Sequence, residues 1–78
     1  MSMRARSGVL AVLAVHYPRE FTTQELTTRV RELVGEAPVE SAIVELDSVG
    51  VLRFRKPLIR PGDPVRAFRE AIFSHSHS

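Results

Sequence analysis

The sequence predicts a single, mostly α-helical domain with one small antiparallel β-hairpin. Three observations lead to this fold class. Apolar residues recur with the helical period of 3.6 in three stretches, glycine or proline separates the stretches, and one short segment near residue 51 changes to the strand period of two. The chain has 78 residues and no cysteine, so its hydrophobic core must stabilise the fold without disulfides.

The first helix is expected at about residues 4–16. Its apolar run, residues 9–15, is too short to cross a bilayer and no processing site follows it, so we expect neither a membrane span nor a cleaved signal, and a cytoplasmic protein. The valines would also suit a buried strand, but the alanines and the length favour a helix. Tyr17-Pro18 ends it, because the residue before a proline is disfavoured in the helical conformation.

A second helix is expected to begin at a capping box. In Thr22-Thr23-Gln24-Glu25, the Thr22 side chain can accept a hydrogen bond from a free amide while Glu25 reaches back to the cap. Phe21, just before it, is predicted to form a very short extended segment. Gly35 is a typical C-terminal stop. The buried stripe is expected to contain Leu26, Val30, Leu33 and Val34.

The third helix is expected to start with Pro38 at its first position and to stop at Gly50. Residues 51–55 then alternate, with arginines on one side of a half-buried strand. Residues 58–60 are long enough only for a short antiparallel partner. The buried face of this helix is expected to contain Val39, Ala42, Ile43, Leu46 and Val49.

A last helix is expected after the turn formed by residues 61–64, with Asp63 as N-cap and Pro64 as first helical residue. Residues 1–73 are thus predicted to form one domain, and residues 74–78 a disordered polar tail. The apolar stripe of the last helix contains Val65, Phe68, Ile72 and Phe73.

The order of these elements resembles that of a winged helix-turn-helix domain. The resemblance is most specific at the end of the third helix and the start of the first wing strand, and it covers about residues 5–73. It points to small bacterial proteins related to transcription regulators. It implies a three-helix core, a two-stranded wing, a C-terminal helix, and double-stranded DNA as ligand. The residues that fit the family pattern are Ile43, Leu46, Val49, Gly50, Val51 and Leu52.

The net charge of +2 is an average over segments of opposite sign. Residues 1–19 carry +3, residues 20–50 carry −5, and residues 51–78 carry +4. In DNA-binding relatives the exposed face of the third helix enters the major groove, but residues 36–50 hold four acids and no lysine or arginine. Since DNA affinity depends mainly on neutralising phosphates, we expect the contact to lie elsewhere. That exposed face is expected to show Glu40, Ser41, Val44, Glu45, Asp47 and Ser48.

The basic wing is the best candidate nucleic-acid feature, because winged-helix proteins often touch phosphates or the minor groove with it. Thr23, at the amide end of the second helix, and Ser41, on the third, complete the candidate set, and Arg4 and Arg6 are candidates for a basic arm. The alternative is a solvated strand face that pairs with acids such as Glu45 and blocks edge pairing. The wing residues are Arg53, Arg55, Lys56 and Arg60.

Two further partners stay open at this stage. The acidic third helix could bind a basic protein surface in place of DNA, and the apolar stripe of the last helix could either form a homodimer or close the domain's own core. No glycine-framed nucleophile or phosphate-binding loop is present, so we expect no enzyme and no cofactor. His75 and His77 fall short of a three-ligand metal site, and His16 is expected to be a half-buried residue at a helix end.

Overall fold

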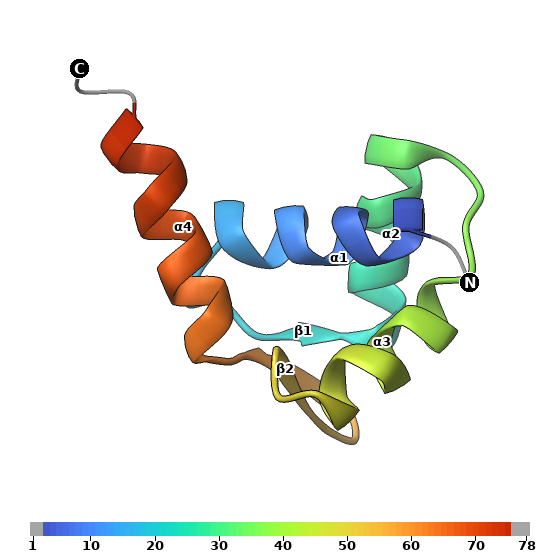
Figure 1. Ribbon diagram of the computed structural model, residues 1–78. Helices are drawn as coiled ribbons and strands as arrows, with labels where there is room; N and C mark the ends of the chain where they lie inside the picture. Colours follow the sequence, from blue (N-terminus) through green and yellow to red (C-terminus); the bar gives the residue numbers. More distant parts are fainter. Residues whose placement is uncertain (1–2, 76–78) are drawn as a thin grey trace.

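The computed structural model describes residues 3–75 and shows helices arranged around a small sheet (Figure 1). The predicted order of elements, mostly helical with a small antiparallel sheet, is confirmed. No helix in this part of the chain is long and apolar enough to cross a membrane. The helices are α1 (Met3–Val15), α2 (Thr23–Val34), α3 (Val39–Ser48) and α4 (Asp63–His75), and the strands are β1 (Phe21–Thr22), β2 (Leu52–Arg55) and β3 (Leu58–Pro61).

The sheet has three strands in the order β1-β3-β2, all antiparallel, and not the two strands expected. Ile59 of β3 lies opposite Phe21 on one side and Phe54 on the other. Residues directly opposite each other share one face of a sheet, so these three apolar side chains line the same face. Burial of Phe21 and Ile59 fixes β1 beside β3, a contact between segments almost forty residues apart that local pattern does not reveal.

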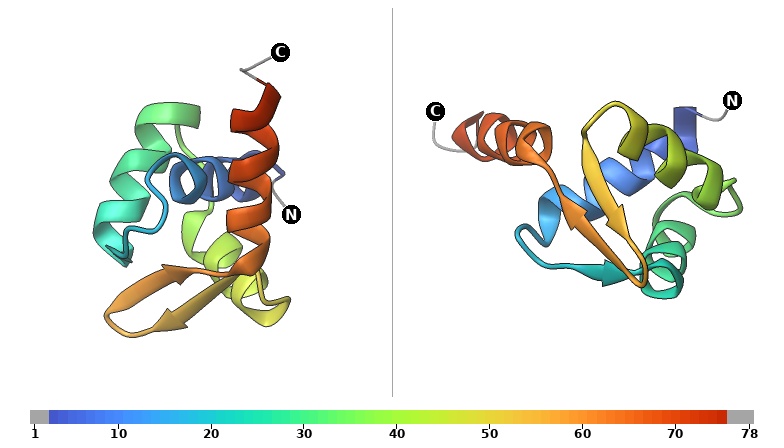
Figure 2. Two further views of the ribbon diagram at one scale, coloured as in Figure 1. Left: turned by 90° about the vertical axis from the view of Figure 1, so that its left-hand side faces the viewer. Right: turned by 90° about the horizontal axis from the view of Figure 1, so that it is seen from below.

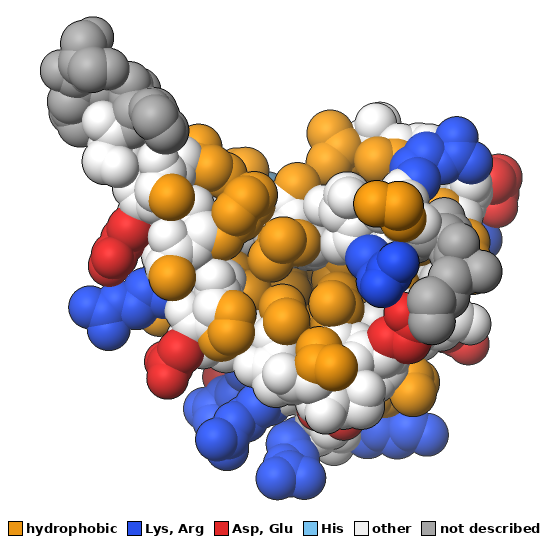
Figure 3. Space-filling view, in the orientation of Figure 1, with side chains coloured by type: hydrophobic (Ala, Val, Ile, Leu, Met, Phe, Trp, Pro, Cys, Tyr) orange, Lys and Arg blue, Asp and Glu red, His pale blue; other side chains and the backbone are white. Residues whose placement is uncertain are grey.

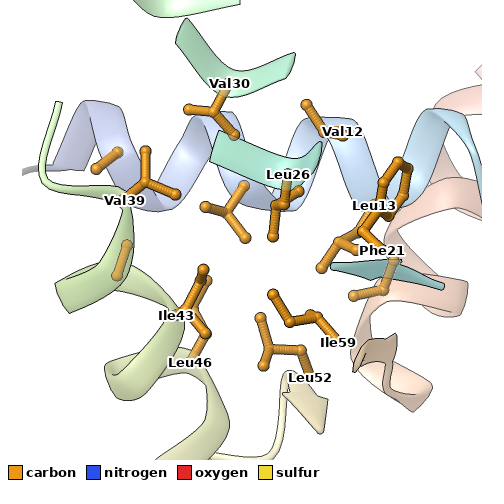
Figure 4. Close-up of a cluster of buried hydrophobic side chains, with 14 of the residues drawn as sticks. Val12, Leu13, Phe21, Leu26, Val30, Val39, Ile43, Leu46, Leu52 and Ile59 are labelled. Atoms are coloured by element: carbon orange, nitrogen blue, oxygen red, sulfur yellow. The ribbon is translucent and has the colours of Figure 1, made fainter. Parts of the chain in front are cut away.

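The core lies between α1, α2, α3 and the inner face of the sheet. Figure 4 shows side chains from all of these elements pointing toward one another. Figure 2 shows α1 in the middle of the bundle, and it contacts α2, α3 and α4. The buried apolar residues include Val9, Leu13, Phe21, Leu26, Val30, Ile43, Leu52, Ile59 and Val65, each at most 1% exposed.

Three of the predicted helix boundaries are confirmed in detail and two shift by one residue. Thr22 and Glu25 form the capping box of α2, and both Gly35 and Gly50 have the positive φ of helix-ending glycines. Pro38, however, is the N-cap of α3 and not its first helical residue. Its ψ of 75° lies outside the helical region, so α3 begins at Val39. Asp63, predicted as the N-cap of the last helix with Pro64 as its first residue, is instead the first residue of α4, and the Gly62 carbonyl accepts from the Arg66 amide.

Several residues expected to be buried are exposed. Leu33 is 58% exposed, and Val49 is 70% exposed because it follows α3 as its C-cap, where the helical period no longer applies. Of the apolar stripe of α4 only Val65 is fully buried, whereas Phe68, Ile72 and Phe73 are 39–45% exposed. Of the α4 helix, only the first turn therefore contributes to the core of the domain. The distal part of the helix projects beyond the body in Figure 1.

Two residues of the predicted tail are helical instead. The α4 helix continues through Ser74 to His75, so these two residues belong to the helix and not to a disordered tail. The Ser74 hydroxyl donates a hydrogen bond to the Ala71 carbonyl one turn earlier, which is a helical interaction. Residues 76–78, including His77, lie outside the described residues.

Candidate nucleic-acid interface

The β2-β3 hairpin presents its arginines on the face of the sheet that points away from the core. Side chains alternate along a strand, so buried Leu52 and half-buried Phe54 leave Arg53 and Arg55 on the opposite, exposed face. The Phe54 N–H donates a hydrogen bond to Oδ1 of Asp47 at 3.2 Å, which ties β2 to the end of α3. This hydrogen bond therefore fixes the position of the hairpin relative to α3.

Arg60 is the one wing cation with an ion pair. It lies directly opposite Arg53 in the β2-β3 ladder, and like charges in such a pair repel. The Glu20 carboxylate, just before β1, accepts a hydrogen bond from Nε of Arg60 and raises the pKa of this guanidinium. Glu20 thus neutralises one of two opposed arginines and leaves the other without a counter-charge.

Arg53, Arg55 and Lys56 make no ion pair within the part of the chain that the structure describes. The acids of α3 do not pair with these cations. Oε2 of Glu45 instead lies 3.7 Å from Nε of Arg6, and Oδ1 of Asp47 accepts a hydrogen bond from the Phe54 amide. Figure 3 shows basic side chains gathered along the lower edge of the molecule, where Figure 1 places the hairpin. The predicted wing cations are therefore available to an external anion, with Arg60 partly occupied.

Most other arginines in residues 3–75 already have a partner. Arg4, a candidate for a basic arm, donates to the Glu36 carbonyl at 3.2 Å, and Arg69 lies over the Phe73 ring. Arg29 on α2 makes no ion pair within 4 Å among residues 3–75. Within this range, Arg29 and the three hairpin cations are thus the lysine and arginine residues with neither an ion pair, a carbonyl acceptor nor a ring contact. The remaining ion pairs are Arg19–Glu25 at 3.4 Å, Arg31–Glu36 at 3.6 Å and Arg66–Glu70 at 3.3 Å.

The amide end of α2 is occupied by its own side chains. The Glu25 amide donates to Oγ1 of Thr22, and the Thr22 amide donates to Oε1 of Glu25 at 3.0 Å. The Thr22 hydroxyl lies 3.2 Å from the same Oε1 and donates to it. The bond from the Thr22 amide, and after it the bond from the hydroxyl, hold the pKa of Glu25 below its usual value. A phosphate at this helix end would have to approach a carboxylate, which weakens the case for Thr23 as a phosphate contact.

The two candidate hydroxyl residues lie in different places. Thr23 lines a hollow together with Lys56 and α3, so it lies beside the hairpin. Ser41 lines a separate hollow on the other flank of α3, next to Thr27 and Arg31 of α2. The structure therefore brings Thr23, but not Ser41, next to the basic hairpin.

The hollow between α3 and the hairpin is a feature that sequence reasoning missed. Its volume is about 390 Å³, and Thr23, Glu40, Ile43, Val44, Phe54 and Lys56 line it. The feature of the sequence that could have indicated this hollow is Val44, an apolar residue among the polar positions of the outer face of α3. It is 61% exposed.

No group of three or more possible metal ligands occurs within residues 3–75. His16 is half-buried, as expected, and its ring packs edge-on against Phe21 at 5.8 Å between ring centres. The backbone of His75 belongs to α4, away from the hairpin.

Comparison with protein-family models, curated proteins and solved structures finds no match for this chain.

Proposed function

We propose that the protein is a winged-helix DNA-binding module of a bacterial, cytoplasmic transcription regulator. The observation that carries the proposal is the group of unpaired cations on the β2-β3 hairpin, Arg53, Arg55 and Lys56. In this interpretation α1, α2 and α3 are the three-helix core, β2 and β3 are the wing, and α4 is the C-terminal helix. The third strand, β1, extends the sheet behind the wing.

The charge distribution favours the wing over α3 as the main contact. Phosphate contacts supply most of the affinity of a protein for DNA without regard to sequence, and arginine binds phosphate in a bidentate way. The exposed residues of α3 include Glu40 and Asp47 and no cation. The hairpin therefore docks on phosphates or the minor groove, while α3 stays out of the major groove.

Binding to labelled random-sequence duplex DNA at two salt concentrations tests this function. We expect affinity that falls as salt rises, because each phosphate contact releases counterions. The double variant Arg53→Ala and Arg55→Ala removes two such contacts, so the slope of log K against log salt should decrease by roughly two. Arg66→Ala on α4 is the matched control, because Arg66 already pairs with Glu70. Undetectable binding of the wild type at low salt would contradict the proposal.

The apolar side of α4 supports a homodimer as the acting form. Phe68, Ile72 and Phe73 are each about two-fifths exposed and lie on a helix that leaves the body of the domain. Exposed aromatic and aliphatic side chains that gather on one face mark interaction surfaces. A second copy of α4 would cover them and would place two basic hairpins on one DNA molecule.

A further inference from the structure

The hollow between α3 and the hairpin has an apolar floor and a charged rim. Ile43, 1% exposed, and half-buried Phe54 form the bottom, and the exposed Val44 side chain forms one apolar wall. Thr23 contributes a polar wall from the start of α2. With a volume of about 390 Å³, the hollow has room for one large apolar side chain.

Val44 is the residue that makes this hollow more than a gap between elements. It is 61% exposed at the middle of an exposed helical face, between the acidic positions Glu40 and Asp47. A β-branched residue is a weaker helix former than alanine, glutamate or lysine, so neither helix stability nor solubility favours valine here. An apolar ligand that covers Val44 would explain why a valine occurs at this position.

The rim charges define the chemistry of the ligand. Glu40 lines the hollow and makes no ion pair within residues 3–75. Asp47 does not line it, but its carboxylate lies next to Phe54, whose amide it accepts from, and adds negative charge nearby. These acids repel a phosphate backbone and attract a cation, whereas the apolar floor suits a hydrocarbon side chain. A peptide with a large apolar residue beside an arginine or lysine satisfies both features, and Lys56 on the opposite rim disfavours a second cation there.

This surface is separate from the basic face of the hairpin. Phe54 lines the hollow, and its neighbours Arg53 and Arg55 lie on the opposite face of β2 because side chains alternate along a strand. We propose that the hollow binds a peptide segment of a partner protein through an apolar anchor side chain, with the adjacent basic residue of that segment held by Glu40. This second binding activity does not depend on DNA binding.

An NMR titration of the isotope-labelled protein tests the site directly. The probes are blocked tetrapeptides that carry Arg-Leu, Leu-Arg, Arg-Phe or Phe-Arg between two glycines, with Glu-Leu and Arg-Ser analogues as negative probes. We expect saturable shifts of the amide signals of Glu40, Val44 and Phe54 with at least one of the four basic apolar probes. The two analogues should shift these signals at least about fivefold less, since each lacks one of the two interactions.

Variants of α3 residues test whether the peptide binds at the hollow and not elsewhere on the protein. Glu40→Lys and Val44→Asp should each weaken binding on the order of tenfold, and Glu40→Gln by about two- to fivefold. Val49→Asp is the matched control, because Val49 is 70% exposed after the end of α3 and does not line the hollow. The three residues changed are all exposed, and far-ultraviolet circular dichroism checks that each of the four variants is folded.

Three results would overturn the inference. The first is no saturable shift with any basic apolar probe up to about 5 mM, the weakest affinity of interest. The second is binding that Glu40→Lys and Val44→Asp leave unchanged. The third is a shift of the same amides when the protein alone is diluted, which would mean that a second copy occupies the hollow. Failure of DNA binding is distinguishable, since Arg53→Ala with Arg55→Ala should leave the peptide titration unaffected.

Discussion

Gly8 is required by a close approach between helices and not by a turn. A Cβ atom at this position would lie 2.8 Å from Cγ1 of Val30 and 3.3 Å from Cγ2 of Val34. Both valines belong to α2, so α1 and α2 touch at a point where only a hydrogen atom fits. In the middle of a helix glycine is otherwise unfavourable by about 1 kcal/mol relative to alanine. The packing of the two helices therefore outweighs local helix propensity at this residue.

Replacing Gly8 by alanine should destabilise the protein by about 1–3 kcal/mol, because overpacking the contact forces α1 away from α2. Urea unfolding followed by circular dichroism measures the change. Ser7→Ala, at the exposed neighbouring position of the same helix, is the control and should have an effect close to zero. A Gly8→Ala variant as stable as the wild type would show that the valines can move aside without cost.

Thr22 and Glu25 determine how the start of α2 responds to pH. The pKa of Glu25 is lower in the folded protein than its ordinary value of 4.5. Its carboxylate therefore contributes stability above pH 4.5, and that contribution is lost as the pH falls through the lowered pKa. Protonation removes the negative charge and so weakens the hydrogen bond that the carboxylate accepts from the Thr22 amide.

Thr22→Ala should lower the free energy of unfolding by about 1 kcal/mol near neutral pH, the usual cost of losing an N-cap. Glu25→Gln should instead reduce the loss of stability between about pH 6 and pH 3, since the variant has no carboxyl to protonate at the cap. Unfolding curves at the two pH values measure both effects. An equal acid response in wild type and Glu25→Gln would assign that response to other carboxylates.

At the scale of the element, the hairpin combines a packed face with a charged one. Leu52, Phe54 and Ile59 face the helices, and Arg53 faces solvent opposite Arg60. The repulsion between these arginines is relieved by Glu20, which comes from a different segment of the chain. The same carboxylate therefore stabilises the sheet and reduces the positive charge that the hairpin would offer to the proposed DNA ligand.

Glu20→Gln should strengthen DNA binding, because it frees Arg60 to make a further phosphate contact. We expect the salt dependence of log K to increase by about one. Glu32→Gln is the matched control, since Glu32 carries the same charge on α2 and makes no ion pair with any of residues 3–75. If both variants increase the slope equally, the effect comes from net charge and not from the release of Arg60.

At the scale of the molecule, the acidic and basic segments of the chain form separate surfaces. The acidic middle segment supplies the outer face of α3, and the basic final segment supplies the outer face of the hairpin. The exposed apolar side chains of α4 (Phe68, Ile72 and Phe73) form a third surface, on a helix whose distal part projects beyond the body in Figure 1. Each surface thus has a different chemistry and a different proposed occupant: a peptide, DNA and a second copy.

The proposed homodimer predicts a mass in light scattering near twice the 8.7 kDa of the chain. Phe68→Arg with Ile72→Arg should give a monomer, because buried charge without a partner opposes association. Ala67→Arg, an exposed position on the opposite side of α4, is the control and should stay dimeric. A wild-type monomer at high concentration would contradict the dimer.

Local sequence patterns predicted the parts of this structure that depend on neighbouring residues. The capping box, the two helix-ending glycines and the alternation in β2 each involve residues within a few positions of one another. The same reasoning found the wing cations, because their exposure follows from the alternation of a strand. It erred at Leu33, which is 58% exposed, and at Val49, which follows α3 as its C-cap, where the helical period no longer applies.

The sequence by itself determined the order of the elements, the helix-start and helix-end signals, and the separation of acidic from basic segments. Only the tertiary structure decided that β1 joins the sheet, that Glu20 neutralises Arg60 but not Arg53, and that α3 and the hairpin enclose a hollow. The physical reason is distance along the chain. Helix caps and strand alternation are short-range, whereas these three features join segments that meet only when the core packs.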